Sequence, residues 1–276
     1  MTSARNAWYA VEAIHDVVYF APGAADAYAS IGITGWWRGY FASRAAALGT
    51  PGARVVSALF HGFSLDFVGR AVPVVWERSS PEAILEARLG VARERLASLM
   101  DGIEPAPVVA ALEELVAGAD YAGRTLAAAH ADVSPASDAV GRLWQLATAL
   151  REYRGDCHVA VLTAHGLGGA AANVLAEACG LTDGRQQTVR GWSDEAWRGA
   201  HTLLAGRGWL DGEGVITEAG RLARTAIEDE TDAVLAAGID DRALAEVAEP
   251  LLTLAARARE TGMVPYPNPT ATPPAG

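Results

Sequence analysis

The sequence has 276 residues, of which 51% are hydrophobic and 20% charged. This composition excludes a largely disordered chain and allows one large or two small domains. The formal net charge of -11, with every basic residue an arginine, disfavours a large nucleic-acid interface, because such an interface needs a basic face. Nucleic acid is therefore an unfavoured partner, although a small local contact is not excluded.

The two cysteines, Cys157 and Cys179, are too few for a disulfide framework or a zinc site, so we expect reduced thiols and no bound metal. A cytoplasmic location fits such thiols best. The first residues contain no apolar secretory segment, and no uncharged apolar run approaches the length of a membrane span. We therefore predict no association with a membrane.

Alanine dominates the apolar residues and clusters of valine and isoleucine are short, a pattern that favours helices over sheet. In the first half the apolar periodicity and turn residues predict successive helices over 6–20, 24–30, 34–48, 53–63, 64–75, 81–100, 105–116 and 122–131. The Ser80-Pro81-Glu82 run is typical of a helix start with proline in the first turn. Val133-Ser134-Pro135 is the best candidate for a domain boundary.

The second half is also predicted to be helical, with helices over 138–153, 156–164, 168–179, 193–205 and 217–237 and a last helix ending near Thr261. Gly155 is expected to let the chain bend between the first two of these helices. Residues 209–217 are predicted to form a small β-hairpin around Asp211-Gly212-Glu213-Gly214. The segment 265–276 is rich in proline and threonine and is predicted to be a disordered tail.

The two halves share an order of landmarks. Trp37 and Arg44 have the same spacing as Trp144 and Arg151, a His-Gly pair follows in each half at His61 and His165, and each half continues with a Ser-x-Glu-Ala run. This order predicts a mainly α protein built from a duplicated helical unit. We therefore expect an N-terminal repeat over 1–133 and a C-terminal repeat over 134–264.

The C-terminal half also resembles a known family. Leu175-Ala176-Glu177-Ala178-Cys179-Gly180-Leu181, the helix that follows Ser193, and Ile216-Thr217-Glu218-Ala219-Gly220-Arg221 are similar to the winged helix-turn-helix of MarR-type regulators over roughly residues 170–235. The whole chain further resembles an actinobacterial helical family that has this segment at its C-terminal end, after an Arg-Glu-x-Arg-Gly-Asp-x-His run such as residues 151–158. The resemblance implies a recognition helix at 193–205 and a wing at 209–217. The wing tip, however, carries Asp211 and Glu213, where a wing that binds DNA is basic.

The candidate functional residues are histidines, arginines and acids set in apolar surroundings. His158 with Asp156, together with His61, are the predicted acid or base groups, because a carboxylate near an imidazole fixes its tautomer and raises its pKa. Arg44 and Arg151 either hold a substrate carboxylate bidentately or simply join two helices through acids. The predicted substrate-binding set is completed by an aromatic wall and a second-half histidine: Trp37, Tyr40, Phe63 and His165.

No glycine-rich nucleotide loop and no nucleophile elbow occurs, so we expect no cofactor. Two functions remain. The first is a helical protein that binds a small organic molecule in an enclosed pocket and acts as a cofactor-independent acid/base enzyme or as a simple binding protein. The second is a ligand-responsive regulator of the MarR type that binds DNA.

Overall fold

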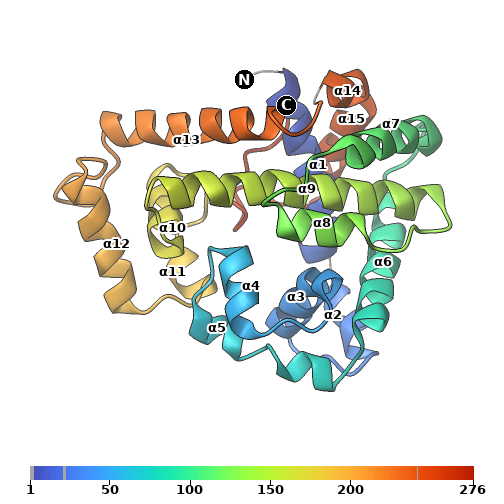
Figure 1. The fold of residues 1–276 in the computed structure, drawn as a ribbon, viewed down its shortest axis with the longest axis horizontal. Coiled ribbons are helices and arrows are strands. Elements are labelled where there is room, and N and C mark those ends of the chain that lie inside the picture. The colour runs from blue at the N-terminus through green and yellow to red at the C-terminus, as the bar shows by residue number, and fades with distance from the viewer. Residues whose placement is uncertain (1–2, 21–22, 241) are drawn as a thin grey trace.

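A computed structural model describes residues 3–20, 23–240 and 242–276, which are mainly helical (Figure 1). The helices in chain order are α1 Ser3–Phe20, α2 Ala24–Ala29, α3 Trp36–Ala45, η1 Ala46–Leu48, α4 Ala53–Phe60, α5 Leu65–Gly69, η2 Val74–Glu77, α6 Pro81–Ala97, α7 Pro105–Gly118, α8 Thr125–Ala131, α9 Ala139–Ala164, α10 Gly169–Ala178, α11 Gln186–Val189, α12 Asp194–Gly206, α13 Glu218–Ala236, α14 Arg242–Glu246 and α15 Ala248–Glu260. The predicted α class is confirmed.

Helix α9 is the central element. It packs against α1, α6, α7, α8 and α13, and Figure 1 shows it crossing the middle of the molecule with α13 alongside. Its buried residues include Leu143, Leu146, Leu150 and Tyr153, so most of its circumference lies in the core. A helix covered on several sides is apolar nearly all round, which is why α9 shows little amphipathic character in the sequence.

The bend expected at Gly155 is not found, because α9 continues as one α-helix from Ala139 to Ala164. Glycine has a low helix propensity, but the buried residues of α9 before and after Gly155 pack against other helices. The stability gained from this packing outweighs the low propensity. The two predicted helices at 138–153 and 156–164 are therefore one.

The structure does not support the predicted duplication. In the first half, the helix that carries Trp37 and Arg44 ends at Ala45, and a separate helix, α4, leads to His61. In the second half, Trp144, Arg151 and the residues up to Ala164 all belong to the single helix α9. The shared landmarks are spacings along the chain, and spacing alone does not fix which helices continue and which break.

The predicted wing is much smaller than a β-hairpin. Within the described residues, 209–217 form a tight turn with one antiparallel bridge between Leu210 and Ile216, closed by the Asp211 amide donating to the Val215 carbonyl at 2.9 Å. The Asp211 carboxylate accepts from the Glu213 and Val215 amides. These side-chain bonds hold the chain in a compact loop and leave too few residues for a strand ladder.

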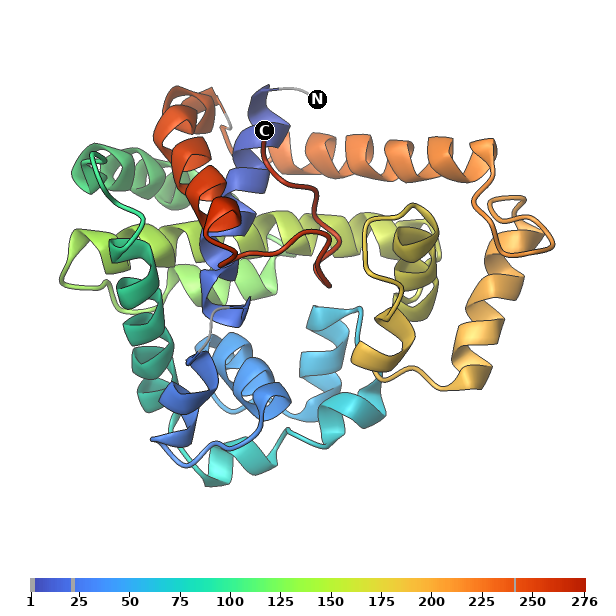
Figure 2. The same ribbon diagram turned by 180° about the vertical axis from the view of Figure 1, so that it is seen from behind.

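The C-terminal segment, for which the sequence predicts disorder, lies along the body of the protein. Figure 2 shows it leaving α15, passing α1 and turning back toward the N-terminal end of the chain. Asn268 is 2% exposed, and the Gly276 amide donates to the Asn6 side chain at 2.9 Å. The segment therefore covers part of the α1 and α9 surface.

Within the part of the chain that the structure describes, no single helix has the length and apolar character needed to cross a membrane; α9 and α10 meet the criteria only as a pair, bent by 101°.

Candidate functional site

A cavity of about 180 Å³ lies beside the middle of α9. Its walls come from α1, α3, α4, α9, α10 and α13, with residues 270–273 of the C-terminal segment on one side. Six of the predicted site residues line it: Tyr40, Arg44, His61, Arg151, Asp156 and His158. Residues separated by more than a hundred positions in sequence thus surround one space, whose lining combines polar and aromatic side chains.

The other three predicted residues lie elsewhere. Trp37 and Phe63 belong to the apolar cluster under α3 and α4, with ring centroids 5.8 Å apart. Phe63 is 1% exposed, and its ring contacts the guanidinium of Arg190, which lines the cavity. His165 follows the end of α9 and contacts Glu230 at 2.8 Å, so it is not among the cavity-lining residues.

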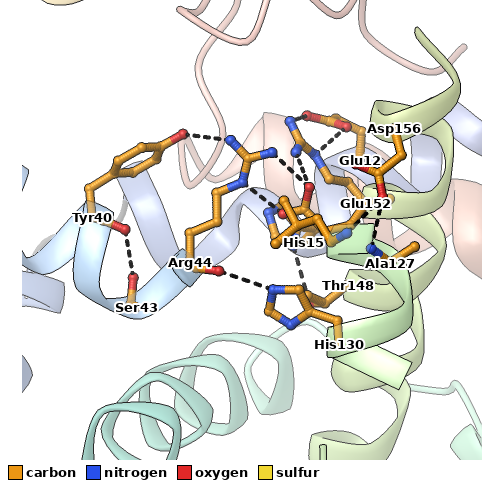
Figure 3. A network of polar contacts seen from close by, with 12 residues as sticks. Glu12, His15, Tyr40, Ser43, Arg44, Ala127, His130, Thr148, Glu152 and Asp156 are labelled. Atoms are coloured by element: carbon orange, nitrogen blue, oxygen red, sulfur yellow. Dashed lines mark hydrogen bonds and ion pairs between the residues drawn. The ribbon is translucent and has the colours of Figure 1, made fainter. Parts of the chain in front are cut away.

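Two of the arginines are held by buried carboxylates. Arg44 donates from Nε and Nη2 to Glu152 at 2.7 Å each, and Arg151 donates to Glu152 at 2.8 Å and to Glu12 at 2.9 and 3.0 Å. Figure 3 shows this network between α1, α3 and α9. The arrangement is the helix-joining alternative that the sequence left open, since most donors of both arginines are occupied.

Glu152, which is 0% exposed, is charged because of these partners. Burial by itself would raise its pKa, but the charges of Arg44 and Arg151 outweigh burial and hold that pKa well below its ordinary value. Glu152 is therefore negatively charged at neutral pH, and it faces two positively charged guanidinium groups.

Asp156 and His158 have different hydrogen-bond partners. The Asp156 carboxylate accepts from the backbone amides of Leu126 and Ala127 at 2.9 and 3.0 Å, which are at the start of α8. His158 Nδ1 lies 3.0 Å from the Thr231 hydroxyl and 3.8 Å from Glu228. The expectation that Asp156 orients His158 is therefore wrong, because residues two apart on a helix point in different directions; Thr231 has that position instead.

Burial dominates the protonation of these side chains. It raises the pKa of Asp156 to about 6, although the two α8 amides oppose the shift. It lowers the pKa of His158 to about 3, against the pull of Glu228, and it also lowers the pKa of His61. At neutral pH both imidazoles are therefore neutral hydrogen-bonding groups, and Asp156 titrates within about a unit of neutrality.

The sequence analysis missed a second set of charged residues in the cavity wall. Arg154 and Arg224 both pair with Glu228, and Arg190 enters from the turn after α11. Arg224, Glu228 and Thr231 occur at i, i+4 and i+7, so one face of α13 could have been recognised from their spacing. No local pattern marks Arg190, because its position depends on the path of a turn.

A larger cavity, of about 460 Å³, lies between η1, α6, α8 and α9. Arg88 and His130 line it, while Glu82, Glu86 and Asp132 make much of its boundary acidic. None of the predicted site residues lines this space. Among the described residues, no group of three or more histidines, cysteines or acids is arranged to hold a metal ion.

Replacing Glu152 by glutamine is expected to destabilise the fold by about 3 kcal/mol, because it leaves the buried guanidinium charges of Arg44 and Arg151 without their shared counter-charge. Denaturant unfolding measures the effect. The control is Glu113→Gln, which removes a surface pair with Arg142 and is expected to cost less than about 1 kcal/mol. Equal losses in the two variants would contradict a structural role for the buried network.

Asp156→Asn is expected to change the pH dependence of stability. A raised folded-state pKa means that the native protein binds a proton more tightly than the unfolded chain, so the contribution is present below about pH 4 and is lost as the pH rises through about 6. The uncharged variant keeps an acceptor for the α8 amides. Its stability relative to the wild type should therefore rise by on the order of 2 kcal/mol between pH 4 and 7.5, as measured by denaturant titrations. A difference that does not vary with pH would contradict the shift.

Helices α10, α11 and α12 form a compact group at one end of α9, with α10 packed against both of the others. The Ser193 hydroxyl caps α12 by accepting from the Ala196 amide. The exposed residues of α12 include Asp194, Glu195 and Arg198, and the following turn exposes Asp211 and Glu213. The outer surface of this group is therefore more acidic than basic.

Comparison with known proteins agrees with this arrangement of helices. Residues 4–265 match a helix-turn-helix family. No curated protein and no solved structure matches the chain. Because the match spans nearly the entire sequence, the chain belongs to this helix-turn-helix family.

Proposed function

We propose that the protein binds a small organic molecule in the cavity beside α9. The observation that carries the proposal is the convergence of polar groups from distant helices, His61, Asp156 and His158, on one space bounded by Tyr9, Tyr40 and Phe60. Concave sites with aromatic walls and a few fixed polar groups are typical of small-molecule binding. The neutral imidazoles orient such a molecule without the desolvation cost of a buried charge.

Asp156 adds a chemical capacity to the site. Its pKa of about 6 allows it to accept or release a proton near neutral pH, as a general base or acid does. Acid/base catalysis on the bound molecule, without a cofactor, is therefore part of the proposal. So is a cytoplasmic location, which the free thiols of Cys157 and Cys179 favour.

A cavity-blocking substitution tests the proposal. Gly155 lines the cavity from the middle of α9, and a Cβ added there would meet its neighbours only at 3.7 Å. Gly155→Leu should therefore fill the space while improving helix propensity. Gly90→Leu is the matched control, because Gly90 is an exposed residue of α6 with open space around it.

Fragments of up to about one aromatic ring are screened by NMR and thermal shift. Fragments that bind are expected to stabilise the wild type and the Gly90 variant but not the Gly155 variant. A screen without binders, or binders that are indifferent to Gly155→Leu, would contradict the cavity as the functional site.

The alternative is a ligand-responsive regulator of the MarR type, which membership of a helix-turn-helix family favours. The charges on α10 to α12 and on the turn that follows disfavour binding to DNA. Of the arginines between residues 183 and 217, Arg185 pairs with Asp183, Arg190 lines the cavity, and Arg207 donates to the His165 carbonyl. Arg198 is exposed on α12, next to Asp194 and Glu195. Few cations remain on the outside to contact phosphates.

We expect fluorescence-anisotropy titrations at moderate salt to show no sub-micromolar binding to duplex DNA, because the outer surface of the segment and the net charge of -11 repel phosphates. Titrations with fragments of the promoter upstream of the protein's own coding sequence are the relevant measurement. A nanomolar complex that weakens steeply with salt would overturn this expectation and favour the regulator.

A further inference from the structure

Arg190 differs from the other arginines of the cavity. Four arginines there pair with carboxylates: Arg44, Arg151, Arg154 and Arg224. Arg190 lines the same space, and among the described residues no carboxylate forms an ion pair with it. The cavity thus contains one guanidinium whose charge the protein leaves without a counter-charge.

The hydrogen-bond acceptors of Arg190 are neutral. Its Nε donates to the Gln186 side chain at 3.0 Å, and its Nη2 donates to the backbone carbonyl of Pro269. Tyr40 lines the same cavity, and the guanidinium lies 4.3 Å from the centre of the Phe63 ring. Burial lowers the pKa of Arg190, and the nearby charges of Arg44 and Arg151 act in the same direction, as expected where a cation lacks an acid.

The Pro269 carbonyl belongs to a segment that a few bonds hold in place. Asn268 forms a local turn, donating to the Pro265 carbonyl and accepting from Thr270. Residues 270–273 then line the cavity without helix or strand. Figure 2 shows this segment crossing in front of the central helices. Arg190 thus donates to a neutral backbone oxygen. An anionic oxygen in the same position would form a stronger, charge-assisted hydrogen bond.

We propose that the cavity binds a small organic oxyanion whose charged group pairs with Arg190 in place of the Pro269 carbonyl. This inference rests on the proposed function and adds the chemical class of its ligand. The guanidinium fork fits a carboxylate or a phosphate with two parallel hydrogen bonds. Binding releases residues 268–273 from Arg190. Before binding, the Pro269 carbonyl occupies the position that an oxygen of the ligand takes afterwards.

The size of the cavity limits which organic oxyanions can bind. Its volume of about 180 Å³ is near that of a cavity of about 150 Å³ that holds benzene. The enclosed space fits the uncharged part of such a ligand, one ring or a short chain, while the anionic group takes the place of the Pro269 carbonyl at Arg190. His61 and His158 then face the uncharged part of the ligand, and Asp156 is the group available to exchange a proton with it.

The test uses the full-length protein with benzoate, its neutral isostere benzamide, and inorganic phosphate as probes. The variant is Arg190→Gln and the matched control is Arg198→Gln, an exposed arginine of α12. Millimolar benzoate or phosphate is expected to raise the melting temperature of the wild type and of the control by several degrees. Benzamide should have a smaller effect, and Arg190→Gln should remove the advantage of the anion.

The two oxyanion sources are separated by which probe stabilises: benzoate alone indicates a carboxylate ligand and phosphate alone a phosphoryl group. Hydrogen exchange gives a readout that does not depend on how well the variant folds. The stabilising anion should speed exchange at the amides of Thr270 and Thr272 in the wild type, because it displaces the segment.

The inference is overturned if neither anion stabilises the wild type more than benzamide does, or if Arg190→Gln keeps the full effect. In the first case, benzamide binding that Gly155→Leu abolishes would leave the cavity proposal standing and remove only the anion. If no fragment binds and no probe stabilises, both proposals fail.

Discussion

The structure depends on one buried carboxylate between two guanidinium groups. Glu152 has no solvent exposure and bonds Arg44 of α3 and Arg151 of its own helix, while Arg151 reaches Glu12 of α1. Removing four charges from water is costly, and their mutual attraction offsets the cost only when each donor is well placed. The network therefore requires α1, α3 and α9 to hold one relative position, and this requirement places Tyr40, Asp156 and His158 around the same space.

The same network also decides which cations are available to a ligand. The sequence suggests Arg44 and Arg151 as a pair that binds a substrate carboxylate, but their N–H groups already donate to Glu12 and Glu152. Arg154 and Arg224 are similarly committed to Glu228. Arg190 alone of the cavity-lining arginines bonds only neutral acceptors among the described residues. The ion pairs therefore separate Arg190 from the other four cavity-lining arginines, which burial alone does not do.

Local signals predicted local structure well. Ser80, Ser193 and Thr217 each accept from the amide three residues on, and helices begin directly after them, as their sequences indicate. The wrong predictions concerned features that depend on tertiary packing. Gly155 predicted a bend that packing suppressed, and a repeated order of landmarks predicted a duplication that the helices do not follow. His61 and His158 do line one cavity. The spacing of Thr231 with Arg224 and Glu228 indicates a shared face of α13, but it does not show that this face meets His158. Arg190 was invisible in the sequence, because a position brought in by a turn has no periodic signature.

Helices α10 to α12, where the sequence predicts a helix-turn-helix, adjoin the cavity. Asn173 of α10 donates to the Gly62 carbonyl at 2.8 Å, and a Cβ on Gly169 would lie 2.0 Å from the His61 carbonyl, so α10 packs directly on the end of α4. Ser64 bonds the carbonyls of Arg190 and Gly191, which fixes the turn leading to α12. A molecule that contacts Arg190 thus contacts the connection between α11 and α12, and it moves that connection only to the extent that it binds two arrangements with different affinity. Tight packing on both sides of this turn favours one arrangement, and that makes the segment in this chain a wall of the cavity.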